Sequence, residues 1–168
     1  FGFSALRVIV VEDNETNRTI ICRIMRQLNC AVVESAGDGD QAMSVMLGSS
    51  HGYDLIISDY QMPGMNGLEF LQAVRVGAPG VNRDIAFIML TGHTDNFIVG
   101  TAFNLDVDSF VVKPVTPKAL RTRIMHVMST PNRIKTPNDY GDITIGPNEI
   151  RKPKTSKEIK FVAPPWES

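Results

Sequence analysis

The sequence has few cysteines, no long apolar run and no strong charge of either sign. Its two cysteines, Cys22 and Cys30, lack the spacing of a zinc or redox motif, so we expect buried free thiols in a reducing compartment. A net charge of −1 argues against broad electrostatic attraction to nucleic acid or membranes. No run approaches the roughly 18 apolar residues that a membrane span needs. We therefore expect a cytoplasmic protein that binds neither membranes nor nucleic acid directly.

The composition is that of a soluble globular protein, with 43% hydrophobic and 21% charged residues. The 168 residues suffice for one ordinary domain and a remainder. Because the chain begins with Phe1 rather than Met, we expect its start to be processed, cut or added.

Strand-like apolar runs alternate with helical periods up to about residue 128. The predicted strands are Leu6–Val11, Ala31–Glu34, Leu55–Ser58, Ile85–Leu90 and Ser109–Val112. The predicted helices are Asn14–Leu28, Asp38–Leu47, Gly67–Val76, Asp95–Leu105 and Pro117–Met128. Strict alternation with near-continuous apolar strands predicts an α/β domain whose parallel sheet is covered by helices on both faces.

Beyond residue 128 the composition changes. The segment 130–168 holds six of the ten prolines and shows no helical stripe. Two short runs, Ile143–Ile145 and Ile159–Val162, are candidate strands that nearby prolines keep short. We expect an extended tail that is ordered only if it docks on the domain or on a partner.

Chemically reactive side chains follow four of the predicted strands. They are Glu12 and Asp13 after the first strand, Asp59 after the third, Thr91 after the fourth and Lys113 after the fifth. The carboxyl ends of parallel strands meet at one edge, where ligands bind in open α/β sheets. We therefore expect three carboxylates, a hydroxyl and an ammonium to converge on a shallow pocket.

These carboxylates would repel one another, since two unit charges about 4 Å apart interact by roughly 4 kcal/mol at an effective dielectric near 20. Lys113 alone cannot neutralise three of them, so the pattern favours a divalent cation. Oxygen ligands favour a hard ion, and Mg²⁺ commonly binds through one or two carboxylates together with phosphate oxygens. Such a site suits phosphoryl transfer to an aspartate, which forms an acyl phosphate.

Four motifs are specific in combination. They are an acidic pair after the first strand, Asp-x-x-Met-Pro-x-x-x-Gly beginning at Asp59, a Thr after the fourth strand, and Lys113-Pro114 after the fifth. In these motifs the chain resembles the receiver domain of a two-component response regulator, over about Ala5–Met128. The resemblance implies a flavodoxin-like, doubly wound five-stranded sheet in the order 2-1-3-4-5. It predicts a receiver domain at 5–128 and a Pro-rich C-terminal extension or linker at 129–168.

The resemblance also implies a role for each residue of this edge. Asp59 would be the phosphoacceptor, Lys113 would pair with the phosphoryl group, and Thr91 would bond it through its hydroxyl. Asp13 and Asp59 would bind Mg²⁺ directly, Glu12 through water, and Gln61 through its backbone carbonyl. Phe110 holds the aromatic switch position of the family. A cis Lys113–Pro114 peptide bond is implied as well.

The implied function is to accept a phosphoryl group from a sensor histidine kinase or a histidine phosphotransfer protein. Such a protein is a signalling domain that catalyses only its own phosphorylation and dephosphorylation. Phosphorylation would switch the surface of the fourth helix, fifth strand and fifth helix for a downstream protein partner. The fourth helix is almost wholly apolar, so we expect it to dock on the chain's own tail, a second copy in a homodimer, or that partner.

Three alternatives remain open. The first is whether the chain is a stand-alone receiver with an extension or a fragment of a longer regulator whose output domain is missing. An aspartate-nucleophile phosphohydrolase is a second function, but Gln61 stands where such enzymes usually carry a second Asp. A flavin-binding module is a third, but Glu12–Glu15 is acidic where a flavin phosphate would need hydroxyls and amides.

Overall fold

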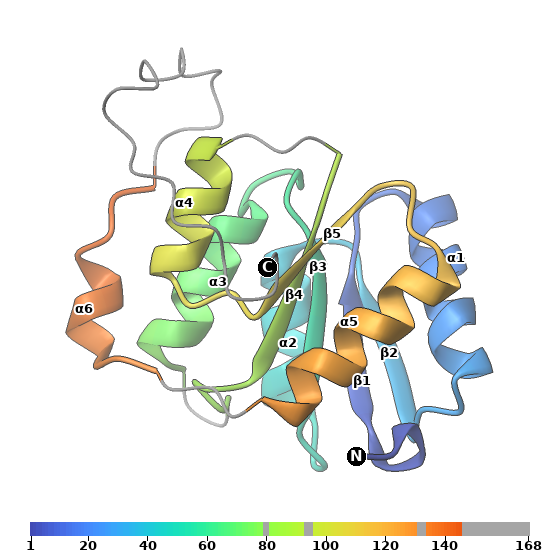
Figure 1. The fold of residues 1–168 in the computed structure, drawn as a ribbon. Coiled ribbons are helices and arrows are strands. Elements are labelled where there is room, and N and C mark those ends of the chain that lie inside the picture. Colours follow the sequence, from blue (N-terminus) through green and yellow to red (C-terminus); the bar gives the residue numbers. More distant parts are fainter. Residues whose placement is uncertain (79–80, 93–95, 131–133, 146–168) are drawn as a thin grey trace.

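The structure, a computed structural model, describes residues 1–78, 81–92, 96–130 and 134–145. Its centre is a five-stranded parallel sheet in the order β2-β1-β3-β4-β5 (Figure 1). The strands are β1 (Arg7–Val11), β2 (Val32–Ala36), β3 (Leu55–Asp59), β4 (Ala86–Thr91) and β5 (Ser109–Val112). The predicted α/β class and the predicted strand order are both confirmed.

The helices follow the strands as predicted. They are α1 (Glu15–Gln27), α2 (Gly39–Gly48), α3 (Gly67–Val76), α4 (Asn96–Asn104) and α5 (Pro117–Ser129), with a 3-10 turn, η1, at Phe3–Ala5. Asn14, Asp38 and Thr116 cap α1, α2 and α5, each accepting a backbone N–H from the first turn of its helix. Among the described residues, no helix combines the length and the apolar character that a membrane span requires.

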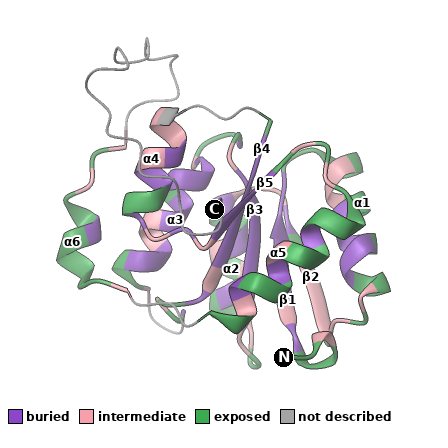
Figure 2. Cartoon of the chain, viewed as in Figure 1, coloured by how far each residue is buried: buried purple, intermediate pink, exposed green. Residues whose placement is uncertain are grey.

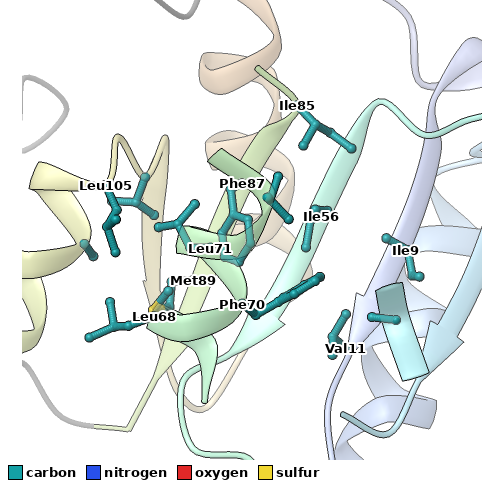
Figure 3. Packing of buried hydrophobic residues seen from close by; sticks show 14 of the residues in the cluster. Ile9, Val11, Ile56, Leu68, Phe70, Leu71, Ile85, Phe87, Met89 and Leu105 are labelled. Atoms are coloured by element: carbon teal, nitrogen blue, oxygen red, sulfur yellow. The ribbon is translucent and has the colours of Figure 1, made fainter. Parts of the chain in front are cut away.

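Alternate residues of each strand face opposite layers of helices, so the sheet lies between two apolar clusters. Ile9, Val11 and Phe87 pack with residues of α2, α3 and α4 on one face (Figure 3). Val8 and Val10 pack with α1 and α5 on the other. Four of the strands are largely buried, whereas the edge strand β2 is mostly half-buried and each helix also has an exposed side (Figure 2). Burial of both faces explains why the strands are almost continuously apolar.

The described part of the tail differs from the expectation of an extended chain. Residues 137–141 form a short helix, α6 (Pro137–Gly141), where no helical stripe is apparent in the sequence. It lies outside α3 (Figure 1) and its Tyr140 is fully buried. Ile143–Ile145, a candidate strand, has no regular secondary structure, and the other candidate strand, Ile159–Val162, lies outside the described residues. The described residues 134–145 are thus ordered by docking on the domain.

Candidate functional site

Three carboxylates converge at the carboxyl edge of the sheet, as the sequence predicts. Glu12 and Asp13 directly follow β1, and Asp59 ends the neighbouring β3. One ligand oxygen from each of the three can be chosen so that all lie within 4.8 Å of one another. Glu12 and Asp59 are only 1% and 5% exposed, whereas Asp13 is exposed. The cluster is therefore buried at Glu12 and Asp59 and open to solvent at Asp13.

The loop after β3 fixes Asp59 by a close backbone approach. The N–H of Gly67 donates to the carbonyl oxygen of Tyr60 at 2.8 Å. A Cβ at Gly67 would lie 2.5 Å from the backbone oxygen of Asp59, so only glycine fits where α3 begins. Asn66 caps α3 in a reciprocal capping box with Glu69. This Gly is the last residue of the Asp-x-x-Met-Pro-x-x-x-Gly motif, and its role is to let the helix start directly beside the reactive carboxylate.

Glu12 is held by its own backbone and by α1. Its N–H donates to the carbonyl oxygen of Ala36 at 3.1 Å, which extends the pairing of β1 with β2. Its carbonyl oxygen accepts from Nη1 of Arg18 at 2.9 Å, and its Oε1 accepts from the N–H of Asn14 at 3.2 Å. These hydrogen bonds thus connect Glu12 to α1 and its N-cap.

Lys113 contacts two of the three carboxylates. Its Nζ lies 3.0 Å from Oε2 of Glu12 and 3.1 Å from Oδ1 of Asp59. Its backbone N–H donates to the carbonyl oxygen of Thr91 at 2.8 Å, which fixes the start of the β5–α5 loop against the end of β4. The Lys113–Pro114 peptide bond is cis, as the resemblance implies.

Burial governs the charges of this cluster. It raises the pKa of Glu12 to about 7, because desolvation and the nearby Asp59 charge outweigh the contact with Lys113. Burial works to lower the pKa of Lys113, but its contacts with Glu12 and Asp59 outweigh burial and raise that pKa above its ordinary value. The ammonium therefore stays charged at neutral pH, while Glu12 is poised to gain or lose a proton there.

Thr91 and Phe110 lie on the neighbouring strands β4 and β5, beside α4. Thr91 ends β4 and is 3% exposed, and Phe110 on the adjacent β5 is 7% exposed. Both line a cavity of about 270 Å³ together with Val99 of α4 and Ala119 of α5. The cavity thus joins the end of β4 to the α4–β5–α5 side of the molecule. Gln61 follows Asp59 by two residues and its side chain is exposed.

The donor set fits a small hard cation. Three carboxylates supply oxygen ligands only, and one of them is open to solvent, which leaves room for water or phosphate oxygens. Among the described residues, the ammonium of Lys113 is the one that pairs with these acids, so a divalent ion would relieve the remaining repulsion.

A sequence model of the response regulator receiver domain matches residues 8–125. The chain belongs to this family. Among curated relatives, it is 37% identical over 119 residues to a probable chemotaxis protein CheY of Rhizobium etli, covering 71% of this chain and 89% of that one. It is 33% identical over 125 residues to a chemotaxis protein CheY homolog of Campylobacter jejuni, covering 74% and 94%.

Solved structures agree with the family. Chemotaxis protein CheY4 of Vibrio cholerae superposes with a TM-score of 0.66 at 28% identity, over 73% of this chain and 98% of that one. The signal receiver domain of a histidine kinase from Syntrophus aciditrophicus gives 0.64 at 27% identity, over 74% and 91%. This chain is therefore a CheY-like receiver of two-component signalling, and the part that aligns spans nearly the whole length of these relatives.

Sequence reasoning overlooked Arg75, which organises the opposite edge of this receiver. Arg75 is fully buried, and its guanidinium donates to the carbonyl oxygens of Arg83, Ile85, Leu105 and Asp106 and to the carboxylate of Asp108. A signal was present, because Arg75 falls at i+4 from Leu71 and i+7 from Leu68, on the buried stripe of α3. A charged residue on such a stripe indicates a buried hydrogen-bonding hub.

Proposed function

We propose that this receiver domain, residues 5–128, accepts a phosphoryl group on Asp59 from a phosphohistidine of a sensor histidine kinase or a histidine phosphotransfer protein. Residues 129–168 are a Pro-rich C-terminal extension or linker. The protein acts as a switch in the cytoplasm and catalyses only its own phosphorylation and dephosphorylation. The proposal is carried by one observation: Lys113 pairs with Asp59 and Glu12 at the carboxyl edge of the sheet.

Asp59 is the nucleophile. One of its carboxylate oxygens attacks the phosphorus of the phosphohistidine, the P–N bond breaks, and an acyl phosphate forms while the imidazole leaves with the electron pair of that bond. Lys113 already lies within 3.1 Å of Asp59, so its ammonium is placed to offset the charge on the transferring oxygens. Thr91 ends the adjacent strand and supplies a hydroxyl donor to the bound phosphoryl group.

Mg²⁺ is the cofactor that this donor set suits. Asp13 and Asp59 would bind it directly, Glu12 through water, and the backbone carbonyl of Gln61 would complete the protein ligands. When bound, the ion neutralises charge on the carboxylates and on the phosphoryl oxygens. The residues of the chain position the carboxylates for it by the backbone contacts of Glu12 and Gly67.

The signal passes from the site to the surface of α4, β5 and α5. Thr91 and Phe110 line one cavity with Val99 of α4, so a shift of Thr91 toward a phosphoryl group changes the packing of that cavity. Phe110 is the switch residue that responds. The altered surface binds a downstream protein partner or a second copy of the chain.

Beryllofluoride, which mimics a phosphoryl group on a carboxylate, tests this proposal. The full chain with Mg²⁺ should give a protein-bound fluorine resonance that Asp59→Asn abolishes. Asp40→Asn is the matched control, because Asp40 is an exposed aspartate on α2. This variant should bind as the wild type does. Equal binding by Asp59→Asn would overturn the assignment of the acceptor.

A further inference from the structure

The segment 134–145 is anchored on the domain by one aromatic side chain. Tyr140 of α6 is fully buried in the apolar cluster that also holds residues of α3 and α4. Ile134, Ile143 and Ile145 pack against the same cluster at its margin. These four apolar side chains stand within an otherwise polar stretch, so the docking is built into the sequence of the segment.

On one side, the segment holds the C-terminal end of α4. The hydroxyl of Tyr140 donates to Oδ2 of Asp106 at 2.6 Å and accepts the N–H of Lys135 at 2.7 Å. Nζ of Lys135 donates to the carbonyl oxygen of Asn104, the last residue of α4, at 3.1 Å. It also lies 3.7 Å from Oδ2 of Asp106.

On the other side, the segment holds α3 and the chain that follows it. The side-chain amide of Gln72 on α3 donates to the carbonyl oxygens of Tyr140 and Ile143, both at 2.8 Å. Nη2 of Arg83 donates to the carbonyl oxygen of Lys135 at 2.8 Å. The segment therefore bridges α3 and the end of α4, two helices that flank each other on the same face of the sheet (Figure 1).

α4 has features of a helix with low intrinsic stability, so contacts from outside it matter. It has nine residues, with Gly100 near its middle, and glycine lowers helix stability. Its last turn has no basic residue to interact with the negative end of the helix dipole. Lys135 supplies that cation from outside the helix, at the carbonyl of Asn104. The stability of α4 thus depends in part on a residue that follows the receiver fold.

We propose that residues 134–145 are an intramolecular strap that holds α4 against α3 and opposes the switching of the receiver. This inference rests on the proposed function, in which modification of Asp59 moves α4. The described arrangement belongs to the unmodified carboxylate, since Asp59 itself pairs with Lys113. Contacts that stabilise this arrangement must be weakened when α4 moves. By reciprocity, weakening the strap favours modification, and modification loosens the strap.

The test measures hydrogen exchange and beryllofluoride binding on the full chain with Mg²⁺. Tyr140→Phe removes only the hydroxyl that joins Asp106 and Lys135, and Gln72→Leu removes both bonds from α3. Tyr53→Phe is the matched control, because it removes a tyrosine hydroxyl that donates to Glu34 on β2, the edge strand at the opposite end of the sheet from β5. All three changes keep the bulk of the side chain.

Beryllofluoride should speed exchange of residues 134–145 in the wild type. Tyr140→Phe and Gln72→Leu should speed exchange in α4 without the ligand, and should lower the half-saturating beryllofluoride concentration about three- to tenfold, the effect of losing one or two hydrogen bonds. Tyr53→Phe should change neither quantity. The strap proposal is overturned if the adduct forms and hydrogen exchange at 134–145 does not change. It is also overturned if the half-saturating beryllofluoride concentration of both strap variants equals or exceeds the wild-type value.

One outcome distinguishes failure of the proposed function from failure of this inference. If no variant or wild type binds beryllofluoride, the phosphoacceptor assignment and the inhibitory role both fail. Exchange in α4 then still decides whether the segment holds the helix, because Tyr140→Phe must speed it and Tyr53→Phe must not.

Discussion

Nζ of Lys113 lies 3.1 Å from Oδ1 of Asp59, although Asp59 ends β3 and Lys113 follows β5, two strands that are not neighbours in the sheet. β4 separates β3 from β5, so the lysine reaches across the end of β4, where Thr91 stands. A group attached to Asp59 would therefore lie near the ammonium of Lys113 and near the end of β4, which carries the hydroxyl of Thr91. This relationship supports the proposal that an anion on Asp59 is bound at this edge of the sheet.

Mg²⁺ binding should depend on pH through Glu12. The pKa of this carboxyl is raised to about 7 by burial, so it is protonated below pH 7 and ionised above it. Because a cation competes with that proton, affinity for Mg²⁺ should rise as pH increases through 7, by about five- to tenfold between pH 6 and pH 8. Titration calorimetry at pH 6, 7 and 8 measures the change.

Glu12→Gln is the control for this pH dependence. The variant should bind Mg²⁺ more weakly than the wild type at pH 8 and with nearly the same affinity at all three pH values. A wild-type affinity that does not change between pH 6 and pH 8 would contradict the role of Glu12.

Gly67 should tolerate no side chain. Its Cβ would lie 2.5 Å from the backbone oxygen of Asp59 and 2.9 Å from Cα of Tyr60, and backbone atoms cannot move aside cheaply. Gly67→Ala should lower the free energy of unfolding by about 3 kcal/mol. Gly100→Ala in α4 is the matched control, since its Cβ meets nothing within 4 Å, and it should stabilise the chain by about 1 kcal/mol. Urea unfolding of both variants distinguishes steric conflict from a general effect of losing glycine.

The strand ends made the site predictable from sequence. Glu12, Asp59 and Lys113 each follow an apolar run, and a parallel sheet with alternating helices brings such positions to one edge. Their contacts confirm that expectation. The resemblance to receiver domains added the strand order and the cis Lys113–Pro114 bond, which local patterns do not specify.

The docked segment was not predictable in the same way. α6 is a five-residue helix, too short to show an apolar stripe, and its order depends on contacts with distant residues such as Gln72 and Asp106. Tertiary contacts of this kind leave no local periodicity. The available signal was one tyrosine and three isoleucines, Ile134, Ile143 and Ile145, in an otherwise polar stretch.

Arg75 and Asp108 form a buried pair whose partners are interdependent. Burial raises the pKa of Asp108 to about 6 even though Arg75 lies 3.2 Å away. Arg75→Met would leave that carboxylate buried without its cation and four carbonyl groups without a donor, and should cost about 3–5 kcal/mol of stability. Adding Asp108→Asn should restore part of this loss, because the uncompensated charge is removed. A double-mutant cycle from urea unfolding gives the coupling, and a strictly additive cycle would show that the two residues act independently.

Two tyrosines should ionise only at high pH. Burial, together with a carboxylate partner, raises the pKa of both Tyr53 and Tyr140 to about 12. Because tyrosines in the unfolded chain ionise near pH 10, folding should lose stability as pH rises from about 10 to 12. Absorbance titration at alkaline pH should show that Tyr53→Phe and Tyr140→Phe each remove one tyrosine from the step near pH 12. A step that both variants leave intact would place these side chains in solvent.

The identity of the phosphorylated residue tests the central claim most directly. The full chain is incubated with Mg²⁺ and a small-molecule phosphodonor, the product is reduced with borohydride to mark acyl phosphates, and the peptides are mapped by mass spectrometry. We expect a single mark at Asp59 in the wild type, the same mark in Asp40→Asn, and none in Asp59→Asn. A mark at Glu12, Asp13 or another residue of the wild type, with Asp59 unmodified, would contradict the account.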